Sequence, residues 1–261
     1  MALHQLTSFT LGVPNLAETA AYYREFGLAD EGDGWLATRD GGRQLRLVPV
    51  PARRLIELRI GVDDADDLDR AASRLHRLGI GAAADPAAGT LTGPVIPRKL
   101  GHVVIGTTDF DATTAFFRDG LGFQASDYVK DVGAFLRCSV DHHNVLVLRA
   151  PVVFPRHSSW QVDDIDEIGR GAHALLAEHP ERHVWGLGRH HAGSNFFYYF
   201  RDPSGTFSEY YSDVDCVPED QIWTPETFEG ARGLFSWGPP PPPSFLHPDD
   251  HADLMAGSHS R

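Results

Sequence analysis

The spacing of apolar residues along the chain predicts small units, each made of one helix and several strands. In the second half, an apolar run at 100–105 precedes a stretch in which Phe110, Thr114 and Phe117 fall on one face of a helix. Strand-like runs follow at 123–130, 133–140 and 144–149. The predicted order is therefore one strand, one helix and three more strands, or βαβββ.

The same order starts again at about residue 155. A strand ends near Trp160, and Asp164 and Glu167 have the spacing of a capping box at the start of a helix. The apolar stripe of that helix consists of Ile165, Ile168, Ala172 and Leu175. Runs at 183–187, 195–200 and 206–211 complete the unit as strands. One such unit cannot bury both faces of its sheet, so we expect two units to pair and close a cup.

The first half of the chain repeats this pattern. The segment VDDADDLD from Val62 corresponds to VDDIDEIG from Val162, and WLATRDGGRQLRLV from Trp35 corresponds to FLRCSVDHHNVLVL from Phe135, both at an offset of 100. A third pair, VPNLAETAAYYREFGL and TTDFDATTAFFRDGLGF, follows the same order at a slightly shorter offset. Three matches in one order indicate two copies of one design.

We therefore predict an α+β fold of four tandem βαβββ units arranged as two modules, 1–97 and 98–215. The segment 216–261 differs, because it contains five consecutive prolines at 239–243 and several aromatic residues. The prolines favour a polyproline II conformation, and the aromatic residues favour packing of this tail onto the body. Beyond about His247 we expect disorder.

Composition limits the classes of function. The chain has 261 residues, 42% hydrophobic and 23% charged, with a formal net charge of −13 and no basic block. A nucleic-acid partner is therefore not expected. No apolar run reaches the roughly 18 residues of a membrane-spanning helix, and the first residues do not resemble a secretory signal. Two cysteines, Cys138 and Cys216, fit a reducing compartment, so we expect a cytoplasmic protein.

Three side chains capable of binding a metal occupy matching places in the second module. His102 and His157 lie in the first strands of its two units, and Glu209 lies in the last strand. The two first strands should be neighbours across a pseudo-twofold axis, so these side chains should converge inside the cup. The first module has Ser8 and Glu57 at the corresponding positions. It therefore keeps the scaffold, and we predict that it has lost the site.

A long motif surrounds these residues. From Gly188 to Glu209 the sequence reads GRHHAGSNFFYYFRDPSGTFSE, and DHHN stands at 141–144. With the repeat, this resembles the type I extradiol ring-cleavage dioxygenases of the vicinal oxygen chelate (glyoxalase-like) superfamily over about residues 1–215. One departure is Tyr198, where the family has an aliphatic residue or Phe; this exchange of one lipophilic residue for another leaves the resemblance intact.

The resemblance implies a metal site and a reaction. His102, His157 and Glu209 would hold Fe(II) on one face, a facial triad that leaves positions for a catechol and O2, and Mn(II) would fit the same ligands. The implied reaction inserts both atoms of O2 and cleaves the ring next to one hydroxylated carbon, as in the catabolism of aromatic compounds. The family commonly assembles, so we expect a homo-oligomer.

The resemblance also assigns roles around the metal. His143 would act as acid and base beside the O2 position, and Tyr199 and His190 would share a hydrogen-bond pattern at the substrate oxygen. The residues matched to the substrate pocket are Val104, Phe135, His190, Asn195 and Tyr199. We assign no role to His142, and we expect Arg156 to be solvated.

Other functions stay open at this point. A metal-dependent lyase or isomerase of the glyoxalase type would need a fuller ligand set, which Ser8 and Glu57 supply poorly. A non-catalytic small-molecule-binding relative predicts loss of the triad, and an inactive relative predicts decay of His143 and Tyr199; all of these residues are present. The sequence leaves undecided the catechol, the choice between Fe(II) and Mn(II), the oligomeric state, the role of the tail and which bond beside the hydroxyl groups is cleaved.

Overall fold

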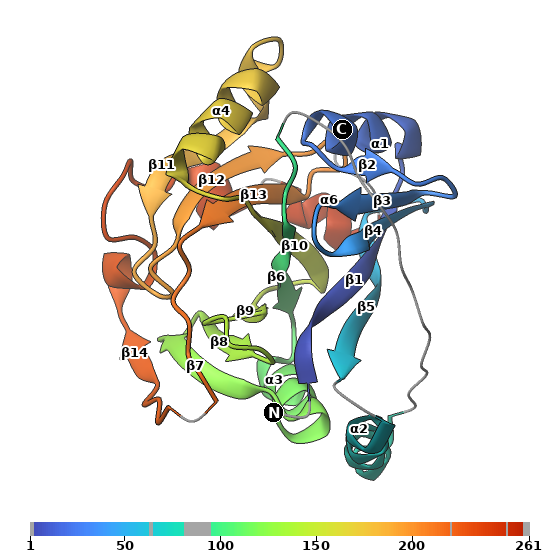
Figure 1. Ribbon diagram of the computed structural model, residues 1–261, viewed down its shortest axis with the longest axis vertical. Coiled ribbons are helices and arrows are strands. Elements are labelled where there is room, and N and C mark those ends of the chain that lie inside the picture. The colour runs from blue at the N-terminus through green and yellow to red at the C-terminus, as the bar shows by residue number, and fades with distance from the viewer. Residues whose placement is uncertain (1–2, 63–64, 81–94, 220, 249, 258–261) are drawn as a thin grey trace.

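Two β-sheets and their helices make up the chain in the computed structural model, which describes residues 3–62, 65–80, 95–219, 221–248 and 250–257 (Figure 1). The first sheet has the strand order β2–β3–β4–β1–β5. The elements of this first module are β1 (Leu3–Val13), α1 (Leu16–Glu25), β2 (Ala29–Asp30), β3 (Trp35–Thr38), β4 (Gly42–Pro49), β5 (Arg54–Val62) and α2 (Ala65–Arg77).

The second sheet has nine strands in the order β11–β12–β13–β10–β6–β9–β8–β7–β14. The elements up to β9 are β6 (Lys99–Thr107), α3 (Phe110–Ala115), the π-helix η1 (Phe116–Leu121), β7 (Gln124–Val129), β8 (Gly133–Arg137) and β9 (Val145–Arg149). The following ones are β10 (Phe154–Gln161), α4 (Ile165–Leu176), η2 (Pro180–Arg182), β11 (His183–Arg189), β12 (Phe196–Arg201) and β13 (Phe207–Ser212). The mixed sheets and few helices confirm the predicted α+β class.

The observed order of elements matches the predicted units. β6 and β10, the first strands of the two units in the second module, are antiparallel neighbours at the centre of the sheet. β1 and β5 pair in the same way in the first module. Of the second unit of the first module, the structure describes β5 and α2; residues 81–94 of this unit lie outside the described residues.

Helix α4 starts as its sequence predicts. The side chain of Asp164 accepts a hydrogen bond from the backbone N–H of Glu167 at 2.8 Å, and the Glu167 carboxylate accepts one from the N–H of Asp163 at 2.6 Å. The first bond satisfies one of the N–H groups that a helix start leaves unpaired, and the second ties Glu167 to the residue before the N-cap. The buried face of the helix, which includes Ile168 and Leu175, then packs into the core.

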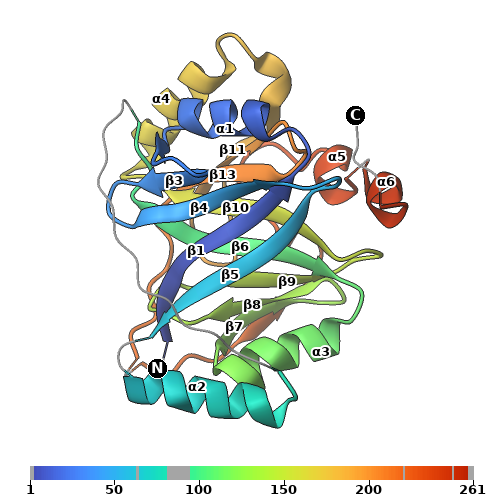
Figure 2. The same cartoon turned by 90° about the vertical axis from the view of Figure 1, so that its right-hand side faces the viewer.

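The two modules share one hydrophobic core. Phe26, directly after α1, stacks on Tyr210 of β13 with 4.0 Å between ring centroids, and the hydroxyl of Tyr23 donates to the carboxylate of Asp202 at 3.0 Å. Figure 2 shows α1 beside the end of the second sheet where β13 lies. Each fully buried aromatic side chain contributes roughly 1.5–3 kcal/mol, so this contact ties the first module firmly to the second.

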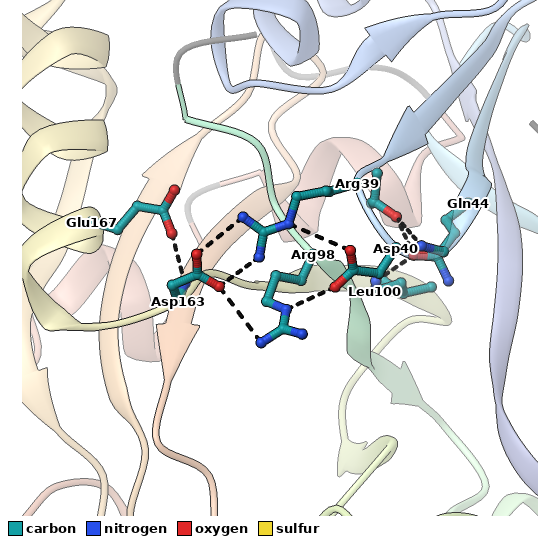
Figure 3. Close-up of polar contacts among 9 residues, drawn as sticks. Arg39, Asp40, Gln44, Arg98, Leu100, Asp163 and Glu167 are labelled. Carbon is teal, nitrogen blue, oxygen red and sulfur yellow. Dashed lines mark hydrogen bonds and ion pairs between the residues drawn. The ribbon is translucent and has the colours of Figure 1, made fainter. Parts of the chain in front are cut away.

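A surface network also joins the modules (Figure 3). The guanidinium group of Arg39 contacts Asp163 at 2.5 and 3.0 Å, and Arg98 contacts Asp40 at 2.8 Å. The hydrogen bond and charge of Arg39 lower the pKa of Asp163. These side chains are 36–48% exposed, so each pair contributes at most about 1 kcal/mol.

The tail packs on the body, as predicted. Its elements are β14 (Glu226–Phe228), which pairs with β7, η3 (Gly230–Gly233), α5 (Pro243–Leu246) and α6 (His251–Met255). The ring of Phe245 lies among Trp185, Tyr199 and Phe207, with centroids at 4.7, 4.8 and 5.7 Å. Within the described residues, no helix is long and apolar enough to span a membrane.

One expectation for the tail needs correction. Pro242 is extended, as in polyproline II, but Pro243 begins α5. Disorder was expected beyond about His247; of that segment, the structure describes α6, and residues 249 and 258–261 lie outside the described residues. Asp250, directly before α6, forms an ion pair with Arg53 of the first module, and both residues are almost completely buried.

Candidate active site

Three side chains from three neighbouring strands converge at the centre of the second sheet. His102 comes from β6, His157 from β10 and Glu209 from β13. The Nε2 atoms of the two histidines are 3.3 Å apart, and Oε2 of Glu209 lies 3.2 Å from His102 Nε2 and 3.6 Å from His157 Nε2. All three residues are buried, as the strand register predicted.

This arrangement fits a divalent metal. Donor atoms about 2.1 Å from an octahedral ion and at right angles to each other lie about 3 Å apart, close to the observed spacing. Among the described residues, Oε2 of Glu209 has no hydrogen-bond donor, although Glu209 is fully buried. A buried carboxylate oxygen without a partner is costly, and a cation between the three groups removes that cost. The described part of the first module offers no comparable cluster of three ligands.

The protonation states also suit a metal. Burial lowers the pKa of His157 well below its usual value, so this imidazole is neutral and keeps a lone pair for coordination. Burial alone would raise the pKa of Glu209, but the neighbouring imidazoles of His102, His190 and His157 together hold it well below its usual value. The site therefore presents the neutral nitrogen of His157 and the carboxylate of Glu209.

His143 lies directly beside the candidate ligands. Its ring centroid is 4.2 Å from that of His102 and 5.0 Å from that of Phe135. Burial, together with the charge of His102, lowers the pKa of His143 well below its usual value, so this imidazole is neutral at neutral pH.

His142 was missed by the sequence reasoning, which gave it no role. It is completely buried, and its Nδ1 lies 3.1 Å from Nδ1 of His143. Its Nε2 lies 2.8 Å from Oδ2 of Asp127 on β7. The only available signal was the doubled histidine at 142–143, and nothing in the sequence marked Asp127 as its partner.

His190 and Tyr199 form the predicted pair. The Nε2 of His190 lies 2.9 Å from the hydroxyl of Tyr199, and its Nδ1 lies 2.5 Å from the carbonyl oxygen of Leu234 in the tail. Because a carbonyl can only accept, the proton of a neutral His190 is on Nδ1, and its Nε2 accepts the Tyr199 hydroxyl proton. Burial, reinforced by the charge of Glu209, raises the pKa of Tyr199, so the phenol stays protonated.

A cavity of about 180 Å³ is lined by two of the three candidate ligands, His102 and His157, while Glu209 is not among its lining residues. Of the predicted pocket residues, Phe135, His190 and Tyr199 line it. Val104 and Asn195 are buried but are not among the residues that line it. Asn195 instead donates to Oε1 of Glu209 at 3.3 Å, because it lies behind the ligand carboxylate.

Arg156, which was expected to be solvated, also lines the cavity. Its guanidinium group donates to the carbonyl of Phe245 and lies 4.2 Å from the centroid of that ring. The pairing register of β10 shifts between Pro155 and His157, and Phe245 of α5 lies against Arg156 at this point. Burial lowers the pKa of Arg156 to about 10, so it remains charged at neutral pH.

Comparison with known proteins places these observations in a family. Residues 99–210 match the family model described as Glyoxalase/Bleomycin resistance protein/Dioxygenase superfamily. Biphenyl-2,3-diol 1,2-dioxygenase from Paraburkholderia xenovorans is 30% identical over 220 residues, which are 80% of this chain and 67% of that protein. The chain belongs to the extradiol dioxygenases of this superfamily.

Other members of the extradiol dioxygenases match a shorter region. Metapyrocatechase 2 from Cupriavidus necator is 38% identical over 154 residues, which are 58% of this chain and 48% of that protein. The chain thus spans about half the length of the first curated relatives that it matches. A Mn(II)-bound glyoxalase from Novosphingobium aromaticivorans has a TM-score of 0.81 at 24% identity, covering 95% of both chains, which confirms the fold.

Proposed function

We propose that this chain is a metal-dependent extradiol dioxygenase that cleaves a catechol with O2, next to one hydroxylated carbon. The observation that carries the proposal is the buried cluster of His102, His157 and Glu209, whose two histidines line a cavity. Two further groups suited to proton transfer, His143 and the pair of His190 and Tyr199, line the same cavity.

The metal that we propose is Fe(II). A facial set of two imidazoles and one carboxylate is typical of non-haem Fe(II) oxygenases. When bound, the ion would bring the two substrates together and let electrons pass from the catechol to O2. Mn(II) is the alternative, since one relative is named an iron-dependent and another a manganese-dependent dioxygenase.

The chain's own residues would bind the catechol and move its protons. The phenol oxygen of Tyr199, whose proton points to His190, can accept a hydrogen bond from one substrate hydroxyl. His143 is neutral and can accept the proton of the other hydroxyl as a general base. The edge of the Phe135 ring, next to His143, would contact the aromatic ring of the substrate.

The rest of the cavity favours an apolar substituent on the catechol. Apart from the candidate ligands and the groups suited to proton transfer, its lining is mostly apolar and includes Val129, Leu146, Phe154, Leu234 and Phe245. Arg156 is the buried cation at this wall, but its guanidinium group already binds the Phe245 carbonyl. We infer that alkyl- or aryl-substituted catechols are better substrates than catechols with a carboxylate.

We also propose a cellular setting, an assembly state and a division of roles along the chain. Two free cysteines fit the reducing cytoplasm, and the family supports a homo-oligomer and a place in aromatic compound catabolism. We propose that the second module, 98–215, is catalytic, that the first lacks a metal site, and that the tail completes the cavity.

The test is O2 uptake by protein loaded with Fe(II) without air. Catechol, 3-methylcatechol, 2,3-dihydroxybiphenyl and 3,4-dihydroxyphenylacetate are added in turn. One O2 consumed per catechol, with a yellow ring-opened product, is the expected result, and the acidic substrate should be the slowest. Metal retained without O2 uptake on any catechol would contradict the dioxygenase and favour a glyoxalase-type lyase or isomerase. Loss of both metal and uptake would contradict the site itself and favour a binding protein.

A further inference from the structure

A hydrogen-bonded chain of three residues runs from β7 to the cavity. Oδ2 of Asp127 lies 2.8 Å from Nε2 of His142, and Nδ1 of His142 lies 3.1 Å from Nδ1 of His143. All three side chains are buried, with residue exposures of 3%, 0% and 4%. Of the three, only His143 lines the cavity.

The tail fixes the direction of the hydrogen bonds. The backbone N–H of Glu226, at the start of β14, donates to Oδ1 of Asp127 at 2.7 Å. A carboxylate only accepts, so Asp127 takes one hydrogen bond from this N–H and a second from Nε2–H of His142. A neutral His142 then has an unprotonated Nδ1, which can only accept the proton on Nδ1 of His143.

We propose that Asp127 and His142 are positioning residues that hold His143 with its proton on Nδ1, which leaves the lone pair of Nε2 for the substrate hydroxyl. The inference rests on the proposed function in one respect, namely that His143 is the base. An imidazole with the opposite tautomer would present an N–H to the hydroxyl and could not accept its proton.

The surroundings of the two histidines support a fixed geometry. Gly193 has a positive φ of +80°, and a Cβ built on it would lie 3.1 Å from His142 Nδ1 and 3.3 Å from His143 Nδ1. The backbone at 193 therefore covers the bond between the two rings. The Trp223 ring of the tail meets the His142 ring edge-on with centroids 5.7 Å apart, and His142 is completely buried.

The decisive variant is Asp127→Asn, because the Glu226 N–H requires the amide oxygen of Asn. The amide NH2 group must then face His142 Nε2 and donate to it. His142 would carry its proton on Nδ1 and donate to His143, whose proton would move to Nε2. We expect kcat to fall about 10²- to 10⁴-fold, with KM and bound metal changed less than about threefold. Asp141→Asn is the matched control, since Asp141 is also buried and directly precedes His142, but pairs with Lys99 at 2.6 Å. This control variant should keep kcat within about twofold of the wild type.

A second pair of variants keeps the test independent of Asp127. The amide of His142→Gln retains one donor and one acceptor, whereas His142→Phe removes both. We expect His142→Gln to retain at least tenfold more activity than His142→Phe, at a similar stability of the two variants. Equal activities, or wild-type kcat in Asp127→Asn, would overturn the proposal.

A spectroscopic measurement separates this inference from the reaction. In metal-free protein with nitrogen-15 histidine, two-bond nitrogen–proton correlations distinguish protonated from unprotonated imidazole nitrogens, and His143→Gln identifies the signal. The expected result is a proton on Nδ1 of His143 in the wild type and on Nε2 in Asp127→Asn. An unprotonated Nδ1 in the wild type would overturn the proposal even if the enzyme cleaves catechols. The expected tautomer without any turnover would instead count against the proposed function alone.

Discussion

Arg53 and Asp250 form an ion pair with 2.5 Å between Nη2 and Oδ2, and their side chains are only 1% and 2% exposed. Arg53 precedes β5 of the first module, whereas Asp250 precedes α6 at the end of the tail. The pair therefore connects two segments almost 200 positions apart in the sequence. Because Phe245 and Leu246 of α5 line the cavity, this connection also holds the cavity wall in place.

Asp250→Ala should destabilise the protein by about 3–5 kcal/mol, because it leaves the guanidinium group of Arg53 buried without this partner. Denaturant unfolding of the metal-free protein measures the change. Asp253→Ala, an exposed position on the same helix, should cost less than about 1 kcal/mol. Equal costs for the two variants would mean that the buried pair does not hold the tail.

Glu209→Ala should abolish retention of Fe(II) and turnover while the protein stays folded. The variant removes the only carboxylate of the cluster, and two imidazoles alone hold the ion far less well. Metal content after gel filtration and the circular dichroism spectrum measure the two effects. Full activity of Glu209→Ala would show that the three residues are not the metal site.

His143→Ala should still bind metal and a catechol but turn over about 10²- to 10⁴-fold more slowly, because a general base is lost. His143 lies beside His102 but is not one of the three converging ligands. Single-turnover kinetics with a measured metal content test this prediction. Loss of metal in His143→Ala would make His143 a ligand and exclude it as the base.

The sequence predicted the parts of the site that depend on strand register. His102 and His157 occupy equivalent strands of a repeat, and the repeat alone places those strands side by side. Arg156 and Asp127 could not be recognised in the same way. Their roles depend on the tail, through Phe245 and Glu226, and no periodicity shows where a tail lies on a folded body. Asn195 was assigned to the substrate, whereas its side chain donates to Glu209 within the same module.

The pH dependence of stability should report on Asp202, a residue of the DPSG motif that joins the modules. Burial raises the pKa of Asp202 to about 6, from an ordinary value of 3.8, although Ser204 and Tyr23 donate hydrogen bonds to it. A carboxyl with a raised pKa favours the folded state when protonated. Its stabilising contribution is complete below about pH 4 and is lost as the pH rises through 6. The difference corresponds to roughly 3 kcal/mol between these limits.

Asp202→Asn removes this titration while an amide can still bond to Tyr23 and Ser204. The unfolding free energy of the wild type, measured without metal, should therefore fall relative to that of Asp202→Asn between pH 4 and 7, by on the order of 3 kcal/mol. Asp163→Asn is a control of opposite sign, because Arg39 lowers the pKa of the exposed Asp163. The unfolding free energy of the wild type should rise slightly relative to that of Asp163→Asn as the pH rises. A constant difference between wild type and Asp202→Asn over this range would show that Asp202 titrates as it does in the unfolded chain, and that burial at the module interface costs its charged form nothing.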